Sequence, residues 1–458
     1  MKNQLQDALK ASRADYTEIR LERTWATAIG FRGSRLEAAT SGIEVGGMVR
    51  CLNHGCGWGH ASFTGLEPLR AMVAQAHELS LAARLDAPIR LAEIPLRYAD
   101  NPADLDGDVR TVSLSEKREL LERLNQEMLI TDRRIVDSQA AYHDRVTERW
   151  VATSDGILLY DMRPEVKLSA GAVAQEESVV ERAFESWAAR GGWKSVQETG
   201  HLFRQAARRA VGQLSAPRVR AGTYPVVLDP RLAGALVHQT IGHLSEADAL
   251  ARRPDLDALM KPGRQVGSGL LTIGDDGSAA SLAGSQTFDD EGSPTRNTLL
   301  VQHGVLVGRL HTRESAGRAG TRPTGNARAA SFRHVPEARL TNVYIANGKG
   351  TLDDLLRGIG FGIYCTDAIG GQAHGGRFSI TVASGQVIRD GKLAEPVKPL
   401  VLAGDMVETL KRVDAVAGDF RWNHLASGCS RPSSGTLPVA EGAPHIRIDG
   451  AWVSGEPA

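Results

Sequence analysis

Two histidines five residues apart are the clearest sign of chemistry in this sequence. They are His238 and His243 of the hexapeptide HQTIGH, and neutral imidazole is the commonest zinc ligand in proteins. On an ideal α-helix, residues with this spacing point about 140° apart. Both rings can therefore reach one metal ion only if the helix ends or widens between them, which Gly242 or a π-type bulge would permit. On spacing alone, an ordinary helix with one buried and one exposed histidine is the better interpretation.

A strand and a helix start precede this histidine pair and would position it. Residues 224–228 form a compact apolar run that is typical of a buried strand. Asp229 is suited to cap the N-terminus of a helix, and Pro230 is suited to its first turn. We therefore predict a helix from residue 231 to about residue 248, and both histidines lie on it.

The composition is that of an ordinary globular protein. The chain has 458 residues, of which 42% are hydrophobic and 24% charged, and this excludes a disordered or coiled-coil chain. Lys plus Arg and Asp plus Glu each number 54, and this zero net charge argues against direct nucleic-acid binding. Four cysteines are too few for a disulfide framework. No secretory signal or membrane-spanning run is found in the sequence, and we expect a cytoplasmic protein.

The periodicity of apolar residues predicts an α+β fold that is rich in antiparallel sheet. Short strands separated by glycine turns are expected near the N-terminus, and residues 135–174 alternate as strands with a hairpin at Asp155-Gly156. Residues 86–113 are rich in Pro and Asp and are predicted to be a linker. Helices are predicted at residues 1–15, 66–83, 114–129, 201–214, 353–356 and 406–413. Ser115 is expected to cap the third of these helices.

A break near residues 215–222 divides the chain into two predicted domains. The first covers residues 1–218 and is an α+β domain with a meander of strands. The second covers residues 219–458, is rich in strands and contains the predicted histidine helix. The chemistry should therefore lie in the second domain.

Several segments of the second half, in order, resemble the TldD/PmbA family of zinc metallopeptidases, also called the modulator-of-DNA-gyrase family. The family's HExxxH helix is similar to LVHQTIGHLSEAD, and its DDEG stretch to FDDEGSPTRNTLLVQHGVLVGRLHTRESA. The further matching blocks are TGNARAASFRHVPEARLTNVYI, GIYCTDAIGG, RFSITVASGQVIRDGKLAEPVKPL and SGCSRPSSGTLPVAEGAPHIRI. Several blocks in the same order are far more specific than any one motif.

The resemblance implies a TldD-like subunit whose zinc-binding helix lies in the C-terminal domain. By position, His238, His243 and Cys429 would hold Zn2+ and leave a fourth coordination position for water. The TldE or PmbA branch of the family lacks the histidine motif, so these residues indicate the TldD branch. Glu246 resembles the glutamate of the family's HGLEGD motif, and it would orient a ligand from outside the coordination sphere.

One position departs from the family pattern. Gln239 stands where the family has its general-base glutamate. A neutral amide cannot take a proton from water, and loss of a general base typically costs about 10²–10⁴ in rate. Either the residue was substituted to trap substrate, or it is a natural variant with weak or altered activity. The sequence leaves both explanations open.

The resemblance also implies the substrate and the partner. The expected activity is hydrolysis of unstructured peptides, in peptide maturation, leader trimming or degradation, with the peptide entering an enclosed cleft as an extended strand. The expected partner is a TldE/PmbA-like subunit in a heterodimer, with self-association as the other possibility. A non-catalytic peptide-binding or scaffold subunit of such a complex is the alternative function.

Other potential sites are weaker. Cys51, His54, Cys56 and His60 follow one another closely, but their spacing matches no common zinc module, and surface or half-buried residues are the better interpretation. Cys365 is expected to be a small buried hydrophobic residue. His374 and Arg377 could line a cleft, although a solvent-exposed loop is the preferred interpretation.

Overall fold

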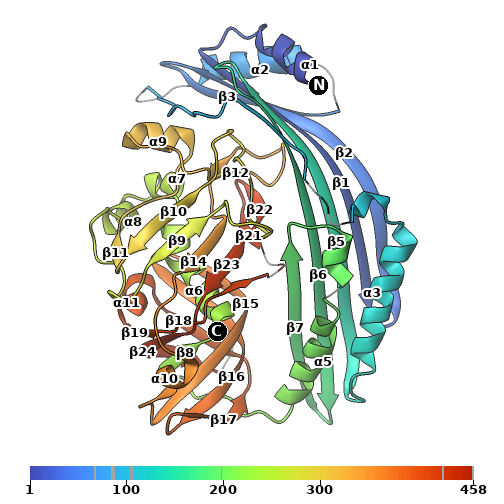
Figure 1. Cartoon of the computed structure of the whole chain (residues 1–458), viewed down its shortest axis with the longest axis vertical. Helices are drawn as coiled ribbons and strands as arrows, with labels where there is room; N and C mark the ends of the chain where they lie inside the picture. Colours follow the sequence, from blue (N-terminus) through green and yellow to red (C-terminus); the bar gives the residue numbers. More distant parts are fainter. Residues whose placement is uncertain are drawn as a thin grey trace.

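A long curved sheet arches beside a C-terminal body of smaller sheets in the computed structural model of this chain (Figure 1). The residues that the structure describes are 1–65, 69–83, 88–103, 105, 107–197, 199–424, 426 and 428–455. All seven strands of the long sheet precede residue 190, and the strands of the other sheets follow residue 221. The fold is thus mixed α/β and rich in sheet, and the predicted boundary at residue 218 stays a prediction.

The strands of the long sheet run in the order β3-β2-β1-β5-β6-β4, and β7 also pairs with β6. Their neighbours are antiparallel except for β4 and β6, which are parallel. The strands are β1 (Tyr16–Arg32), β2 (Arg35–Asn53), β3 (Gly57–Thr64), β4 (Tyr98–Asn101), β5 (Ile135–Thr153), β6 (Leu158–Glu176) and β7 (Val179–Ala189). The hairpin predicted at Asp155-Gly156 is confirmed, since it joins β5 to β6.

Three sequence-based expectations for this half are wrong in detail. The short N-terminal strands are two continuous strands, β1 and β2, because their pairing with each other and with β5 bridges the glycines. The predicted linker contains β4, which adds to the edge of the sheet beside β6. The helix at residues 114–129 is capped by Ser113 rather than Ser115, since the Ser113 side chain accepts a hydrogen bond from the Glu116 backbone N–H.

Helices cover this sheet at its two ends (Figure 1). Their apolar faces bury Leu121, Met128 and Phe203 against β5 and β6, and Val73 and Ala76 against β2 and β3. This gives the half a hydrophobic core on each helix-covered part of the sheet. The helices are α1 (Lys2–Leu9), α2 (Leu69–Ala82), η1 (Val109–Thr111), α3 (Leu114–Leu129), α4 (Trp193–Gln197) and α5 (His201–Gln213).

The C-terminal half contains two main sheets. In the first, the order is β15-β8-β24-β18-β16-β17, β19 also pairs with β24, and the pairing of β15 with β16 closes five strands into a ring. These strands are β8 (Gly222–Leu228), β15 (Phe361–His374), β16 (Arg377–Arg389), β17 (Lys392–Val397), β18 (Leu400–Asp405), β19 (Val413–Val416) and β24 (Ile446–Ser454). The second has the order β11-β10-β9-β14-β23-β20, with β9 (Ile273–Asp276), β10 (Asn297–Gln302), β11 (Val305–Leu306), β14 (Asn342–Ile345), β20 (Arg421–Asn423) and β23 (Ala440–Ala443).

Smaller elements complete this half. Two short hairpins are formed by β12 (Ala327–Arg328) with β13 (Glu337–Ala338), and by β21 (Gly428–Arg431) with β22 (Gly435–Pro438). The helices are α6 (Pro230–Val237), the π-helical turn η2 (His238–Gly242), α7 (Ala247–Ala251), α8 (Pro254–Leu259), α9 (Arg313–Ala319), α10 (Leu352–Leu356) and α11 (Met406–Lys411). Helix α6 packs against β15 of the ring and against β14 and β23 of the second sheet. In the described part of the chain, no helix is long and apolar enough to cross a bilayer.

Candidate metal centre

Helix α6 is a short buried helix whose start is fixed by its own sequence. The Asp229 carboxylate accepts a hydrogen bond of 2.8 Å from the Leu232 backbone N–H, and Pro230 occupies the first turn. Both features were predicted and both are confirmed. Every residue of Leu232–Val237 is buried, which explains why the segment is apolar all round rather than on one stripe.

A π-helical turn separates the two histidines. Helix α6 ends at Val237, and η2 covers His238–Gly242, so the helix widens where the sequence required it to widen. One extra residue per turn brings His243 back to the same side as His238, and their ring centroids lie 5.0 Å apart. The interpretation with one histidine on each face of a regular helix is therefore wrong. The predicted continuous helix to residue 248 is also interrupted, because α7 begins separately at Ala247.

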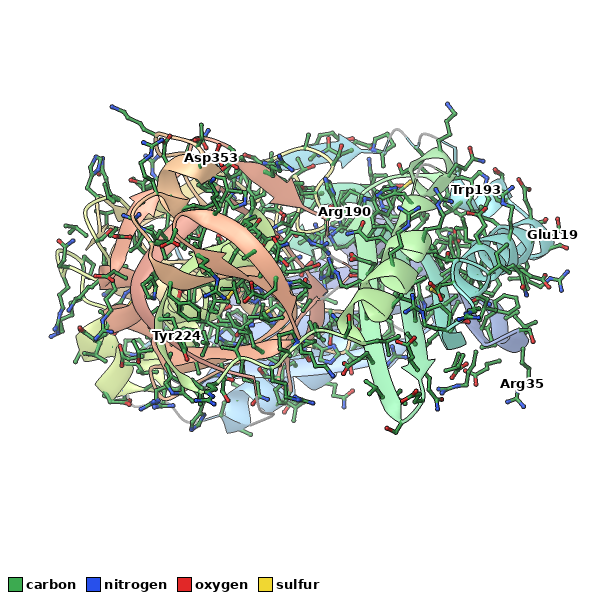
Figure 2. The ribbon with its side chains drawn as sticks, turned by 90° about the horizontal axis from the view of Figure 1, so that it is seen from below. Arg35, Glu119, Arg190, Trp193, Tyr224 and Asp353 are labelled. Atoms are coloured by element: carbon green, nitrogen blue, oxygen red, sulfur yellow. The ribbon has the colours of Figure 1, made fainter. Side chains whose placement is uncertain are left out.

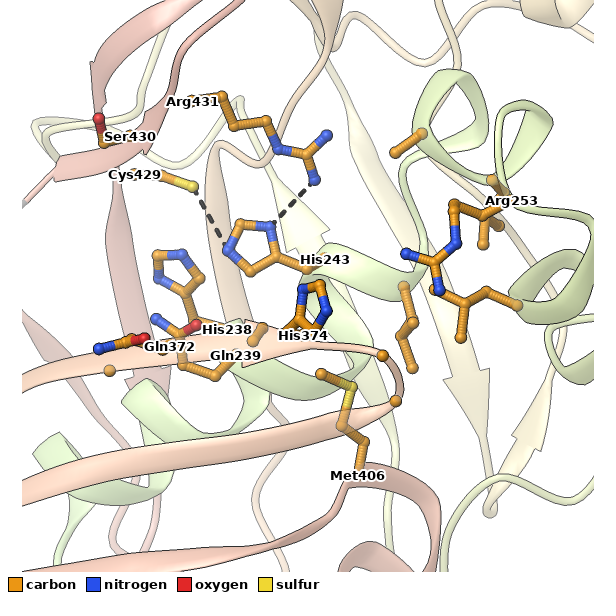
Figure 3. Close-up of a pocket in the computed structure, with 18 of the residues that line it drawn as sticks. His238, Gln239, His243, Arg253, Gln372, His374, Met406, Cys429, Ser430 and Arg431 are labelled. Carbon is orange, nitrogen blue, oxygen red and sulfur yellow. Dashed lines mark hydrogen bonds between the residues drawn. The ribbon is translucent and has the colours of Figure 1, made fainter. Parts of the chain in front are cut away.

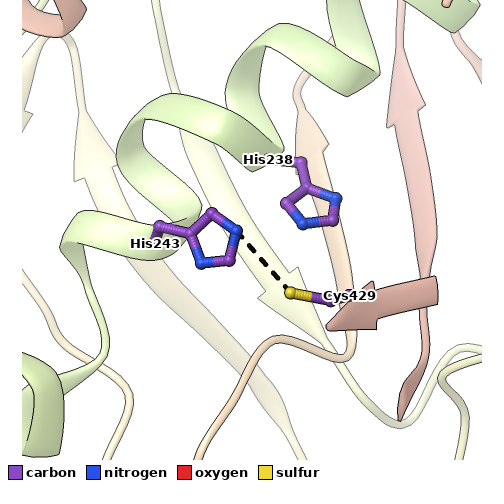
Figure 4. A group of neighbouring side chains, drawn as sticks. All are labelled: His238, His243 and Cys429. Atoms are coloured by element: carbon purple, nitrogen blue, oxygen red, sulfur yellow. Dashed lines mark hydrogen bonds between the residues drawn. The ribbon is translucent and has the colours of Figure 1, made fainter. Parts of the chain in front are cut away.

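A thiol from a distant strand meets the two rings (Figure 4). Cys429 lies on β21 and is buried, and its Sγ is 3.6 Å from His243 Nε2. The ligand atoms of His238, His243 and Cys429 all lie within 4.8 Å of one another. In a tetrahedral zinc site, bonds of about 2.0–2.1 Å to nitrogen and about 2.3 Å to sulfur place such atoms about 3.5 Å apart. The spacing and the donor types thus fit a zinc ion.

The charges of this group favour a thiolate. Burial opposes ionisation of Cys429, but His238 and His243 outweigh it and lower the pKa of the thiol from 9.0 to about 3. Burial likewise opposes protonation of His238, while Cys429 and Glu441 raise its pKa to about 10. Without a metal, the group is therefore a buried ion pair of imidazolium and thiolate, and a divalent cation would replace the protons.

Glu441 contacts the Nδ1 atom of the His238 ring. Its Oε1 atom lies 2.6 Å from His238 Nδ1, and both side chains are buried. A carboxylate can only accept, so Nδ1 carries a proton, and Nε2 is the nitrogen that would bind a metal once a cation displaces its own proton. The close approach depends on Gly234, because a Cβ there would lie 2.9 Å from the Glu441 Cβ on β23.

Three charged residues surround His243. Glu246 is fully buried, and its Oε1 lies 3.7 Å from His243 Nδ1. Arg431 donates a hydrogen bond of 3.3 Å to the same nitrogen and also forms an ion pair with Glu246. Arg339 donates to the Cys429 carbonyl at 2.6 Å, and its Nε lies 3.7 Å from Glu246. This arginine therefore connects the strand that carries the thiol to the segment that carries the second histidine.

Gln239 faces a cavity of about 520 Å³ beside these residues (Figure 3). It is half-buried, and within the described residues its amide has no hydrogen-bond partner in the protein. Strand β15 passes close to it, since a Cβ on Gly371 would lie 3.0 Å from Gln239 Cγ. Figure 3 shows Gln372 and His374 on the same hairpin, alongside the histidines. His374 is thus exposed and lines this cavity, whereas Arg377 is absent from its lining.

The other candidate residues lie elsewhere. The prediction of surface or half-buried residues is wrong for Cys51, which lies in the core with its thiol 3.4 Å from the Thr17 hydroxyl. It is confirmed for Cys56, which is half-buried, and for His54 and His60, which are exposed. Cys365 is fully buried on β15, as predicted. Glu441, Arg339 and Arg431 were not singled out from the sequence, although all three lie in blocks that carry the family resemblance. Their positions within those blocks do not indicate which histidine or thiol each of them contacts.

Comparisons with known proteins agree over most of the chain. Family models described as the PmbA/TldA metallopeptidase domain 1, central domain and C-terminal domain match residues 17–80, 107–214 and 221–455. The chain is 38% identical over 450 residues to a metalloprotease of Synechocystis sp., covering 98% of this chain and 96% of that protein. It is 29% identical over 321 residues to a zinc metalloprotease TldD homolog of Saccharolobus solfataricus, covering 69% and 70% of the two chains.

Among solved structures, TldE from Thermococcus kodakarensis has the same fold. The TM-score is 0.78 over 99% of each chain, at 19% sequence identity. These matches identify the chain as a metallopeptidase-type protein. It belongs to the PmbA/TldA metallopeptidase family, which is the TldD/PmbA family that its sequence blocks resemble.

Proposed function

We propose that this chain is a TldD-like zinc metallopeptidase subunit that acts on unstructured peptides, in maturation, leader trimming or degradation. The observation that carries the proposal is the meeting of His238, His243 and Cys429 from two distant segments, with ligand atoms within 4.8 Å. A relative named a zinc metalloprotease supports the choice of metal. Two neutral imidazoles and one thiolate are a ligand set that leaves zinc one open position, as catalysis requires.

The residues around the ligands have positioning roles in this proposal. Glu441 holds His238 in the tautomer that leaves Nε2 free. Glu246 lies 3.7 Å from His243 Nδ1 and pairs with Arg431, which donates to that nitrogen, so Glu246 positions the arginine that contacts the second histidine. Zinc bound here would supply a Lewis acid that polarises a peptide carbonyl and promotes the ionisation of water.

Gln239 limits the proposed reaction. Its amide lies in the cavity beside the ligands, where the family's glutamate would accept a proton from water. An amide has no basic group, so it orients water or substrate by hydrogen bonds and does not take the proton. We therefore expect weak activity or none for the chain as it stands.

A substrate peptide would lie along β21 as an extended strand. Among the described residues, β21 pairs as a strand only with β22, so a peptide backbone could be added as a further strand at its other edge. Cys429 lies on β21, so a peptide added there would pass the proposed zinc. The solved structure of TldE from Thermococcus kodakarensis shares the fold of this chain. We therefore propose a TldE-like partner subunit, which would enclose the cleft.

Gln239 also favours a second candidate function. A chain that retains the ligands and the cavity but lacks the base could bind peptides without cleaving them. In that role it would be a peptide-binding or scaffold subunit of a TldD/TldE-type complex. The peptidase role predicts that a glutamate at position 239 increases hydrolysis, whereas the binding role predicts that it does not.

The test is hydrolysis of an unstructured peptide by zinc-loaded protein, with and without a TldE-like partner. Gln239→Glu should raise kcat/KM by about 10²–10⁴ over the chain as it stands. Gln239→Ala is the matched control, since it changes the same position without supplying a base. Equal hydrolysis by the Glu and Ala variants, with zinc bound to both, would contradict the peptidase proposal and favour the binding role.

A further inference from the structure

A small cavity rich in arginine lies where the long sheet meets the C-terminal half. Its volume is about 90 Å³, and five arginines but only three carboxylates line it. Phe288 and Asp290 of the C-terminal half meet β5 and β6 of the sheet here, through hydrogen bonds and ion pairs with Arg149 and Arg163. The charged lining residues are Arg145, Arg149, Arg163, Arg190, Arg328, Glu22, Glu44 and Asp290.

Three of these arginines have carboxylate partners in the protein. Arg149 contacts Asp161 at 2.9 Å and also pairs with Asp290. Arg163 contacts Asp161 at 3.0 Å and Asp290 at 3.4 Å. Arg145 contacts Glu165 at 2.7 Å. The other two lining carboxylates are engaged as well, since Glu22 pairs with Arg20 at 3.2 Å and Glu44 with Arg333 at 2.6 Å.

Arg190 and Arg328 have no such partner. Within the described residues, no carboxylate oxygen lies within 4.0 Å of either guanidinium. Arg190 donates only one long hydrogen bond, 3.4 Å to the Pro164 carbonyl, and its buried Nε has no acceptor. Arg328 is fully buried and donates only to the carbonyls of Leu340 and Pro438, and its Nε is also without an acceptor.

Both guanidinium groups are in an electrostatically unfavourable environment. Burial, helped by the nearby Arg163 and Arg328 and opposed by Glu165, lowers the pKa of Arg190 from 12.5 to about 9. Burial likewise lowers the pKa of Arg328 to about 10. Arg328 is fully buried and Arg190 is half-buried, and a cation that is removed from water without a counter-charge is costly, so a bound anion would stabilise both groups.

A second cavity is lined by two of the five arginines, including Arg190 but not Arg328. It has a volume of about 490 Å³, and Arg163 and Arg190 line both cavities. Five hydroxyl side chains line its remaining wall, and three of them, those of Ser278, Ser285 and Thr295, already donate to acceptors in the protein. The five residues are Ser278, Ser281, Ser285, Thr287 and Thr295. Figure 2 shows Arg190 at the junction between the long sheet and the C-terminal half.

We propose that this arginine cavity binds a small oxyanion, either phosphate or a carboxylate, through the guanidinium groups of Arg190 and Arg328. Arginine is the residue that best matches the planar or tetrahedral oxygens of such groups. A volume of about 90 Å³ accommodates several water-sized groups, and therefore one polyatomic oxyanion. Nothing in this proposal depends on peptidase activity.

The bound anion would also lie beside the β21–β22 hairpin, which carries the proposed zinc ligand Cys429. Leu437 and Pro438 line the arginine cavity, and Leu437 pairs with Cys429 across the β21–β22 hairpin. Arg328 holds this hairpin through the Pro438 carbonyl at 2.7 Å. An anion that neutralises Arg328 would thus stabilise the β21–β22 hairpin, which carries the Cys429 thiol.

The test is thermal unfolding of the full chain in sodium phosphate, sodium acetate or sodium chloride at matched pH and ionic strength. Phosphate or acetate should raise Tm by at least about 2 °C relative to chloride, since a ligand that binds only the native state stabilises it. Phosphate and acetate distinguish the two sources of the oxyanion. Equal Tm values in all three salts would overturn the proposal without any variant.

Two variants assign the effect to the cavity. In Arg190→Gln, the dissociation constant of the effective anion should rise at least about tenfold, because one charge-assisted hydrogen-bonding group is lost. Its Tm in chloride should be unchanged or higher, since an unpaired cation has been removed. Arg357→Gln, at a guanidinium that is 76% exposed, should respond as the unaltered chain does. An anion effect of the same size in Arg190→Gln would show that the anion binds elsewhere and would overturn the proposal.

Discussion

His238 Nδ1 lies 2.6 Å from Glu441 Oε1, and this contact fixes which nitrogen of the ring faces the cysteine. The two residues are 203 positions apart in the chain, so only the packing of α6 against β23 brings them together. The contact orients the first proposed ligand before any metal arrives. Such pre-orientation lowers the entropic cost of binding the ion.

Glu441→Gln should weaken zinc binding. The amide retains the shape of the side chain, but it removes the negative charge that orients His238 and makes the imidazole more basic. Loss of such a partner typically reduces metal affinity by about 10–100-fold. The zinc dissociation constant, measured by competition with a chelator, checks this. Glu408→Gln, whose side chain is 62% exposed on α11, is the matched control and should leave the constant unchanged.

Gly234→Val should disrupt the site by increasing the separation of α6 and β23. A Cβ at this position lies 2.9 Å from the Glu441 Cβ and 3.0 Å from Asn423 Nδ2, so a larger side chain forces β23 away from α6. We expect a loss of about 1–3 kcal/mol in the free energy of unfolding, together with weaker zinc binding. Urea unfolding measures the first effect and chelator competition the second.

The matched control for this variant is Gly212→Ala on α5. A Cβ at Gly212 has nothing within 4 Å, so alanine should preserve or slightly raise stability through its better helix propensity. If Gly234→Val unfolds at the same urea concentration as the unaltered chain, the tight packing of α6 against β23 is contradicted.

Asp290 should make stability depend on pH in the acid range. Burial opposes its ionisation, but Arg149, Arg163 and Arg20 outweigh burial and hold its pKa well below 3.8. The unfolded chain therefore takes up a proton near pH 3.8, whereas the folded chain does so only at lower pH. The stabilisation is complete above this range and is lost as the pH falls through it, by up to about 1.4 kcal/mol per pH unit.

Asp290→Asn tests this assignment by urea unfolding at pH 6, 4 and 3. At pH 6 the variant should be less stable by about 3–5 kcal/mol, because two buried arginines lose a charged partner. The difference from the unaltered chain should narrow as the pH falls below about 4. Asp7→Asn at the exposed N-terminal helix is the control. A difference that stays constant from pH 6 to pH 3 would contradict the proposed role of Asp290.

The sequence predicts local elements better than the pairing of strands that lie far apart in the chain. The α6 start is set by Asp229 and Pro230, and the hairpin at Asp155-Gly156 by its turn residues, so both could be read from a few neighbouring residues. The lengths of β1 and β2 depend on pairing with β5, far along the chain, and short-range patterns do not contain that information. The same is true of β4, whose partner β6 lies more than fifty residues away.

The candidate site also has features that local sequence predicts and features that depend on contacts between distant segments. The need for a wider turn between His238 and His243 followed from helix geometry, and η2 meets it. The choice of Cys429 came from family resemblance, since no local pattern connects it to α6. Glu441 and Arg339 act through contacts made only in the folded chain, and their positions in the sequence gave no indication of those contacts.

The most direct test of the account is zinc X-ray absorption spectroscopy on the metal-loaded chain and on Cys429→Ser. We expect one zinc per chain, with one sulfur at about 2.3 Å and nitrogen ligands at about 2.0–2.1 Å, and loss of the sulfur signal in the variant. Cys51→Ser, a buried cysteine far from the site, should retain that signal. A zinc site without sulfur, or a sulfur signal that survives in Cys429→Ser, would contradict the proposal that His238, His243 and Cys429 hold one ion.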